Sequence, residues 1–197
     1  MTITAAGNGR GRRAARRRTQ AARVAPVAGL LAALALSLAA AQPAAAVEAV
    51  ARGTVTGLPL PRYVSLKSDR VNLRRGPGKD HATVWIYQRA GLPVEITAEF
   101  ETWRRVRDSE GVEGWVLHSL LSGKRTGLVT PWEKEGALTP MRRAASDDAG
   151  LVARLAPRVI VQVEKCDGTW CEVEVRRRRG YVRQERLWGV YPGEVVN

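Results

Sequence analysis

Hydrophobic and polar positions alternate with a period of two in several segments after residue 60. Residues 94–96 and 171–175 carry an aliphatic or cysteine side chain at every second position, with glutamates between them, and residues 159–163 are rich in β-branched side chains. Such alternation is typical of antiparallel strands that are buried on one face. No segment after residue 47 has the pattern of a helix of three turns. The pattern therefore predicts an all-β protein.

Turn-forming residues separate these segments. Gly76-Pro77-Gly78 predicts a tight turn, because proline fixes φ and glycine permits positive φ. Residues 108–111, Asp-Ser-Glu-Gly, predict the turn of a hairpin. The four arginines at 176–179, followed by Gly180, predict an equivalent exposed turn later in the chain.

Three short motifs occur twice in the same order, with an offset of about 67 residues. In the first copy they cover residues 72–78, 102–103 and 114–116, and in the second copy 141–144, 169–170 and 180–182. We therefore predict one small β-module used twice, at residues 61–123 and 137–192. Around the modules we expect a flexible leader at 47–60, a connector at 124–136 whose Leu128 and Val129 could add an edge strand, and a tail at 193–197. The pattern does not decide which module the connector joins.

The first 46 residues have the pattern of a secretory signal peptide. Seven arginines and no acidic residue precede an apolar stretch rich in alanine and leucine, and Ala44-Ala45-Ala46 supplies small residues for cleavage. We expect the general secretory route rather than the twin-arginine route, with cleavage before Val47. The alternative is that residues 27–41 remain as a membrane anchor, although that stretch is shorter than the roughly 20 residues a span needs. The mature chain is expected to be periplasmic or extracellular, without an integral membrane span.

Removal of this segment changes the charge balance. The whole chain has 32 basic and 19 acidic residues, a formal net charge of +13. The segment holds 7 of the basic residues and none of the acidic ones, so the mature chain carries 25 − 19 = +6. A moderate positive charge suits a protein beside anionic surface polymers, and it also suits simple solubility.

Cys166 and Cys171 are the only cysteines in the chain. Export places them in an oxidising compartment, and the intervening Asp-Gly-Thr-Trp resembles a four-residue hairpin loop, so a disulfide is the first expectation. A zinc site is less favoured, because both histidines, His81 and His118, belong to the other repeat. A catalytic thiol is less favoured still, because nothing nearby marks either cysteine as an activated thiolate. No metal site, cofactor site or catalytic constellation is recognisable.

The first repeat resembles the bacterial SH3-like (SH3b) domains of exported and cell-wall proteins. The resemblance rests on residues 71–78, 103–106, 114–116 and 120–121. The second copy is degenerate, because it lacks the Gly-Pro turn and has Tyr181 in place of a tryptophan, and residues 187–192 resemble the ending of exported two-module proteins. The resemblance implies two small, partly open β-barrels in tandem, frequent association with peptidoglycan and no catalytic activity.

Aromatic and arginine side chains supply the candidate ligand contacts. Trp103 lies three positions before Val106, so the two side chains should leave a regular strand on opposite faces, and Trp103 should lie outside the core or on a bulge. Aromatic rings suit sugar rings or peptide stems, and arginines suit carboxylates or phosphates. The alternative for each is an ordinary core or solvent-exposed position. The candidate ligand-binding residues are Arg74, Arg75, Tyr87, Trp103 and Trp115.

These features favour an exported, non-catalytic binding protein that engages peptidoglycan or another envelope component. The alternative is a periplasmic scaffold that recruits an envelope enzyme through protein contacts. The run of arginines at 176–179 could suggest nucleic acid, but an exported protein rarely meets it, and basic runs at hairpin tips are commonly solvated. We therefore expect no nucleic-acid partner.

Overall fold

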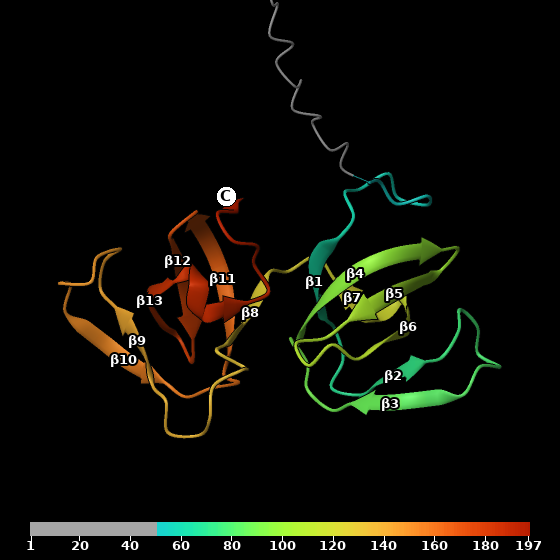
Figure 1. Ribbon diagram of the computed structural model, residues 1–197, viewed down its shortest axis with the longest axis horizontal. Helices are drawn as coiled ribbons and strands as arrows, with labels where there is room; N and C mark the ends of the chain where they lie inside the picture. Colours follow the sequence, from blue (N-terminus) through green and yellow to red (C-terminus); the bar gives the residue numbers. More distant parts are fainter. Residues whose placement is uncertain (1–50) are drawn as a thin grey trace, which may run out of the picture. The chain divides into compact units, whose positions relative to one another are not determined.

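The structure is a computed structural model that describes residues 51–197, all of which belong to one compact unit (Figure 1). The predicted signal peptide lies outside the described residues. Two β-sheets form the unit, as the all-β prediction required. The strands of the first sheet are β1 (Arg62–Leu66), β2 (Val71–Arg74), β3 (Thr83–Tyr87), β4 (Pro93–Phe100), β5 (Trp103–Arg107), β6 (Glu113–Leu117) and β7 (Leu121–Ser122), with the 3₁₀ turn η1 (His118–Leu120).

The second sheet repeats the first. Its strands are β8 (Thr126–Val129), β9 (Thr139–Arg142), β10 (Leu151–Leu155), β11 (Ile160–Asp167), β12 (Trp170–Val175), β13 (Arg178–Arg183), β14 (Leu187–Trp188) and β15 (Val195–Val196), with η2 (Gln184–Arg186). The strand order is β3-β2-β6-β5-β4-β1-β7 in the first sheet and β10-β9-β13-β12-β11-β8-β14 in the second. Every strand of the first sheet therefore has a counterpart seven strands later. This confirms the tandem SH3-like barrels.

The comparison of strand orders also places the connector. Strand β8 pairs with β11 and β14 and corresponds to β1, so it is an internal strand of the second barrel. Leu128 and Val129 are buried there. The second sheet therefore includes Thr126–Val129, which the expected bounds assigned to the connector, and β8 is paired on both sides instead of forming an edge strand. The tail also contributes, because β15 pairs with β11.

Each barrel has its own apolar core. The alternating side chains of β2, β4, β5 and β6 fill the first core, which includes Leu73, Ile96 and Val106. The second core includes Val173 and both cysteines. Cys166 and Cys171 face each other across β11 and β12 and form a disulfide, which confirms the prediction. The connecting loop is shorter than expected, since only residues 168–169 lie outside the two strands.

A glycine in each repeat allows two strands to approach closely. A Cβ atom on Gly114 would lie 2.7 Å from the carbonyl oxygen of Arg74, and one on Gly180 would lie 2.7 Å from that of Arg142. Any larger residue would force β6 away from β2, or β13 away from β9. The Gly-aromatic-Val motifs at residues 114–116 and 180–182 therefore recur because β6 approaches β2 closely in the first barrel and β13 approaches β9 closely in the second.

The described part of the predicted leader, residues 51–60, makes specific contacts with itself and with the first barrel. Its backbone folds back on itself, with a bridge between Arg52 and Pro59. The carboxylate of Glu99 in β4 accepts hydrogen bonds from the backbone N–H groups of Val55 and Thr56, at 3.0 and 2.8 Å. A Cβ atom on Gly53 would clash with the Glu99 carboxylate, so a larger residue there would have to displace this side chain.

Candidate functional site

A cavity of about 310 Å³ opens on the first barrel beside β2 and β5. Trp103, Leu117 and Leu120 form its apolar wall, and Asn72 adds an amide. Three cations, Arg70, Arg74 and Lys79, complete the lining, which contains no acidic residue. Two of the predicted ligand contacts, Arg74 and Trp103, therefore meet here.

Trp103 lines the cavity from the first position of β5, three positions before Val106. The register of β4 against β5 shifts between Ile96 and Ala98, opposite the stretch from Val106 to Arg105. Trp103 is 8% exposed, yet it belongs to neither apolar core, whereas Val106 is fully buried in the first core. Trp103 thus lies outside the apolar cluster that holds Val106, and the strand face from which its side chain leaves stays a prediction.

Arg74 holds the loop that carries Lys79, another of the three cations. Its Nη1 donates hydrogen bonds to the carbonyl oxygens of Lys79 and His81, at 2.8 and 2.7 Å. These bonds fix the loop after Gly76-Pro77-Gly78 against β2. Within residues 51–197, none of Arg70, Arg74 and Lys79 forms an ion pair with a carboxylate. The cavity therefore presents uncompensated positive charge beside an apolar wall, an arrangement suited to an anionic group with an apolar neighbour.

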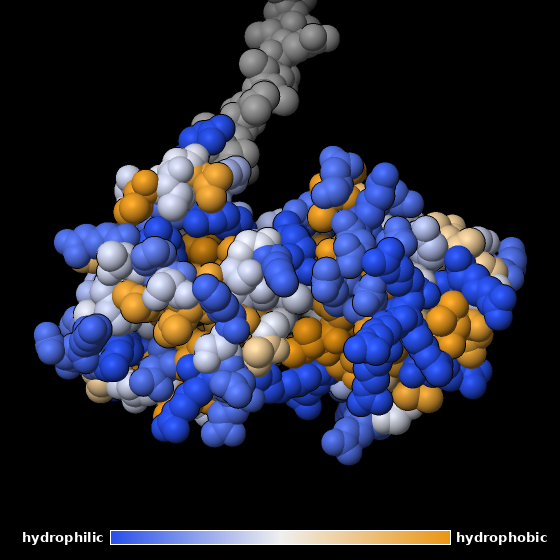
Figure 2. All heavy atoms as spheres, turned by 180° about the vertical axis from the view of Figure 1, so that it is seen from behind, coloured by the Kyte–Doolittle hydropathy of each residue, from blue (hydrophilic) through white to orange (hydrophobic). Residues whose placement is uncertain are grey.

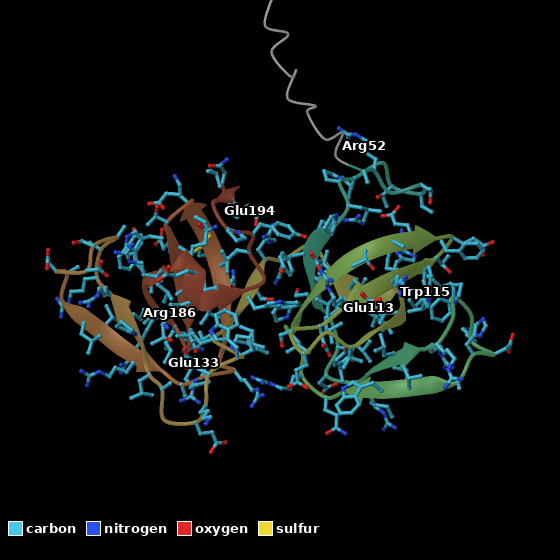
Figure 3. All side chains as sticks on the ribbon, viewed as in Figure 1. Arg52, Glu113, Trp115, Glu133, Arg186 and Glu194 are labelled. Carbon is cyan, nitrogen blue, oxygen red and sulfur yellow. A yellow bond between two sulfur atoms is a disulfide. The ribbon has the colours of Figure 1, made fainter. Side chains whose placement is uncertain are left out.

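The other predicted contacts lie elsewhere. Tyr87 belongs to the first core and donates a hydrogen bond to Asp108 at 3.0 Å, and burial followed by the Asp108 charge raises the pKa of its phenol. Tyr87 was expected among the ligand contacts, but the structure places it in the first core and outside the cavity lining. Arg75 is exposed, and Trp115 is half-buried opposite Arg74 and Arg105 in the sheet, outside the cavity lining (Figure 3).

Sequence reasoning missed Arg70, Lys79, Leu117 and Leu120. Arg70 directly precedes β2, and Lys79 follows the Gly-Pro-Gly turn that returns the chain to its end. Only the closure of that turn brings the two cations together. A signal was present, because both flank the motif on which the family resemblance rests.

The second barrel has an equivalent cavity of about 480 Å³ beside Trp170, which is 7% exposed. The guanidinium of Arg183 lies 4.5 Å from the centre of the Trp170 ring and is paired with Asp147. Its hydrogen bond to Asp147 lowers the pKa of that carboxyl. Glu185 and Arg186 also line this cavity, and Arg186 pairs with Glu133 at 3.6 Å (Figure 3).

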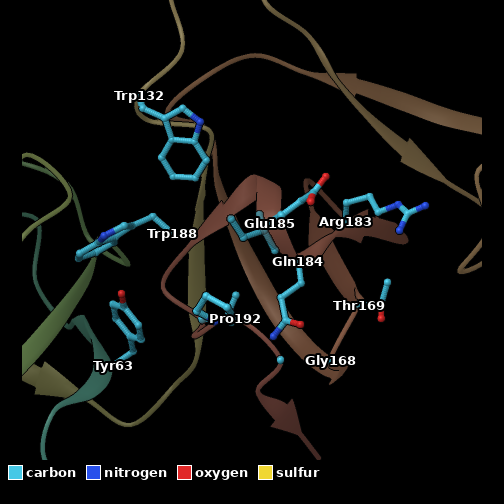
Figure 4. A pocket seen from close by; sticks show the side chains of 12 residues that line it. Tyr63, Trp132, Gly168, Thr169, Arg183, Gln184, Glu185, Trp188 and Pro192 are labelled. Atoms are coloured by element: carbon cyan, nitrogen blue, oxygen red, sulfur yellow. The ribbon is translucent and has the colours of Figure 1, made fainter.

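A third cavity, of about 450 Å³, is lined mainly by the second barrel together with Tyr63 of β1 (Figure 4). Trp132, Trp188 and Pro192 give it apolar walls, and Trp132 is 56% exposed. The rings of Tyr63 and Trp188 meet edge to face at 5.0 Å. Burial, and then the charge of Glu95, raises the pKa of Tyr63 to about 12, so its phenol stays protonated at neutral pH.

Strand β3 leaves an apolar surface at the edge of the first sheet. Val84 and Trp85 are 43% and 54% exposed. On the face that Figure 2 presents, the hydrophobic surface forms separate patches between hydrophilic side chains. Edge strands with exposed apolar side chains are common sites for pairing with another chain.

Neither a metal centre nor a membrane-spanning helix is found in the described part of the chain. No group of three or more histidine, cysteine, aspartate or glutamate side chains is arranged to hold a metal ion among residues 51–197. In the same residues, no helix is long and apolar enough to cross a membrane.

Comparison with solved structures finds proteins that share little sequence with this chain. The similar structures include NlpC2 and NlpC1 from Trichomonas vaginalis, both with a TM-score of 0.30 and 13% identity, over 65% and 69% of this chain and 48% of each of those chains. An NlpC/P60 family protein from Bacillus cereus ATCC 10987 has a TM-score of 0.29 and 10% identity, over 64% of this chain and 55% of that chain. The chain thus matches only about half the length of these proteins.

Comparison with family models and with curated proteins complements the comparison with solved structures. No curated protein matches the chain. The model of the bacterial SH3 domain matches twice, at residues 67–123 and 135–189, and these matches cover more than half of the sequence. Each match covers most of one of the two sheets and begins after the first strand of that sheet, β1 or β8. The chain therefore belongs to the bacterial SH3 domain family, with two such domains in tandem.

Proposed function

We propose that the protein is an exported, non-catalytic binding protein that engages peptidoglycan or another cell-envelope component through its first barrel. The single observation that carries the proposal is the cavity of about 310 Å³ beside Trp103, called here the Trp103 cavity. In it three cations that have no carboxylate partner face an apolar wall. Peptidoglycan offers both complements, since its stem peptides bear carboxylates and small apolar side chains. The basic charge of the chain adds a general attraction toward anionic polymers.

Two features support the exported location. The disulfide between Cys166 and Cys171 suits an oxidising compartment. The first 46 residues have the sequence pattern of a signal peptide. Amino-terminal sequencing of the exported protein should therefore begin at Val47. Recovery of the intact amino terminus in the membrane fraction would instead favour the anchor.

Co-sedimentation with purified peptidoglycan sacculi tests the binding. We expect the purified protein to be retained at low salt. We expect Trp103→Ala and Arg74→Ala to lose most of the retention, because the first removes the aromatic part of the apolar wall and the second removes a cation that also holds the loop of Lys79. Lys134→Ala, an exposed position outside the cavity, is the control. A protein that stays in the supernatant at every salt concentration would overturn wall binding.

A scaffold that recruits an envelope enzyme is the second candidate, and the exposed apolar side chains of β3 favour it. Val84 and Trp85 lie on an edge strand, where a partner could add a strand of its own. Crosslinking in the periplasm distinguishes the two functions. A protein partner that survives high salt and is lost on Trp85→Ser would favour the scaffold.

A further inference from the structure

We propose that the Trp103 cavity takes a ligand with a free carboxylate next to a small apolar group, such as the carboxyl end of a peptide. We also propose that the equivalent cavity of the second barrel is not a second copy of this site, because its charges are already paired internally. The inference rests on the proposed binding function and names the ligand chemistry of that same site. The comparison of the two barrels, position by position, carries it.

The position facing the tryptophan differs between the barrels. Trp103 lies opposite Leu117 in the register of β5 and β6. Trp170 lies opposite Arg183 in the same register of β12 and β13. The second barrel therefore covers its ring with its own guanidinium, 4.5 Å from the ring centre, whereas the first barrel has only a leucine there.

The charge of one loop residue beside each cavity also differs in sign between the two barrels. Arg74 and Arg142 are equivalent, because each lies opposite the aromatic residue of the Gly-aromatic-Val motif and each donates from Nη1 to the carbonyl oxygen seven positions later. Five positions after them come Lys79 and Asp147. The second barrel thus supplies a carboxylate where the first barrel supplies an ammonium group.

Each charged side chain of the second cavity has an ionic partner. Asp147 pairs with Arg183, and Arg186 lies 3.6 Å from Glu133 and 4.0 Å from Glu185. The first cavity has three cations and no carboxylate. In the second barrel Asp147 neutralises Arg183, the cation beside the tryptophan. The first cavity has cations but no carboxylate of its own, so a carboxylate of the ligand would neutralise them.

The apolar wall decides which anion is favoured. Trp103, Leu117 and Leu120 offer aliphatic and aromatic surface directly beside the cations. A carboxylate attached to a methyl-bearing carbon can pair with the cations while its methyl group contacts this wall, whereas inorganic phosphate has no apolar part to bury. The size of the cavity, about 310 Å³, suits a group of one or two small residues.

The test uses nuclear magnetic resonance of the indole N–H signals with three probes: N-acetyl-alanyl-alanine, its carboxyl-terminal amide and inorganic phosphate. We expect the free acid to shift the Trp103 signal and to leave Trp170 unchanged, with at least tenfold weaker responses to the amide and to phosphate. Equal responses to acid and amide would overturn the proposal. A phosphate response as strong as that of the acid would also overturn it, because the site would then select charge alone.

Exchange of the two distinguishing positions provides a second, independent test. Lys79→Asp with Leu117→Arg installs the internal pair of the second barrel and should abolish the Trp103 response. Lys134→Gln gives the same net charge change at an exposed position and should leave it intact. Asp147→Lys with Arg183→Leu removes the pair and should give Trp170 a response to the acid. If the first exchange unfolds its barrel, the second still decides, because an unresponsive Trp170 would contradict the comparison.

These results are separable from the test of the proposed function. Retention on sacculi without any Trp103 response would leave envelope binding in place and overturn the carboxylate site. A selective Trp103 response without retention on sacculi would uphold the site and overturn peptidoglycan as the target.

Discussion

Tyr191 donates a hydrogen bond from its phenol to Oε1 of Glu95 at 2.8 Å, across 96 positions of the sequence. Glu95 lies in β4 of the first barrel and is only 3% exposed, and its other oxygen accepts a hydrogen bond from Nε of Arg107 at 2.9 Å. Burial, followed by this hydrogen bond, raises the pKa of Tyr191. The ring of Tyr191 also lies 4.6 Å from that of Tyr63. The two barrels are thus joined by a partly buried polar contact and an aromatic pair.

Tyr191→Phe should destabilise the protein by about 1–2 kcal/mol, because a buried carboxylate loses a donor while the aromatic contact remains. Urea unfolding followed by tryptophan fluorescence measures the change. Tyr181→Phe is the matched control, since no side-chain hydrogen bond of Tyr181 is found among residues 51–197. Equal unfolding midpoints for Tyr191→Phe and the native protein would show that the contact contributes nothing.

Reduction of the disulfide should destabilise the second barrel selectively. Cys166 and Cys171 are only five positions apart, so in the chain-entropy model the closed loop contributes roughly 2 kcal/mol. Both cysteines lie in the second core, and neither lies in the first. Hydrogen exchange should therefore show faster opening of β11 and β12 after reduction, with β4 and β5 unchanged. Mass spectrometry checks the starting state, since the bridged protein is two hydrogens lighter than the reduced one.

Glu99 should give the first barrel a dependence on acidic pH. Burial opposes ionisation of its carboxyl, but hydrogen bonds from Thr56, Arg62 and the backbone of Val55 and Thr56 outweigh it and lower the pKa from 4.5 to about 2. A carboxyl with a lowered pKa stabilises the fold above its unfolded-state pKa, so this contribution is complete above pH 4.5 and is lost as the pH falls toward 2. The shift corresponds to about 3 kcal/mol.

Measurement of the unfolding free energy between pH 6 and pH 2 tests this effect. We expect Glu99→Gln to lower stability at neutral pH and to flatten the acid part of the curve. Glu113→Gln is the control, because Glu113 pairs with Arg105 at 2.6 Å on the exposed side of the sheet. An acid dependence that persists in full after Glu99→Gln would assign it to other carboxyls.

The sequence predicted those features that depend on local pattern. Alternation located β4, β11 and β12, and the spacing of Trp103 from Val106 pointed to a tryptophan outside the apolar cluster that holds Val106. The repeat was recognisable because closure of each barrel demands a glycine in the same place, at Gly114 and Gly180. The disulfide followed from the spacing of two cysteines around a turn.

Features that depend on distant segments were missed or only partly predicted. Leu128 and Val129 of β8 were expected only as an edge strand, because the segment lacks clear alternation and its place between β11 and β14 depends on those strands. Residues 51–60 fold back against the first barrel because Glu99, more than 40 positions later, accepts the N–H groups of Val55 and Thr56. Lys79 joins the cavity only after a turn has closed. In each case the decisive partner is far away in the sequence, so no local pattern carries the information.

The turn between β12 and β13 offers a stabilising substitution. Arg176 and Arg177 have φ angles of 49° and 63°, in the left-handed region that favours glycine and asparagine. Two residues of this conformation between Val175 and Arg178, which face each other, form the two-residue hairpin turn in which Asn-Gly is preferred. Arg176→Asn with Arg177→Gly should therefore raise stability by about 1–2 kcal/mol, measured by urea unfolding. Arg176→Lys with Arg177→Lys keeps the charge and should change little. A lower midpoint for the Asn-Gly variant would show that the arginines make contacts that outweigh their backbone strain.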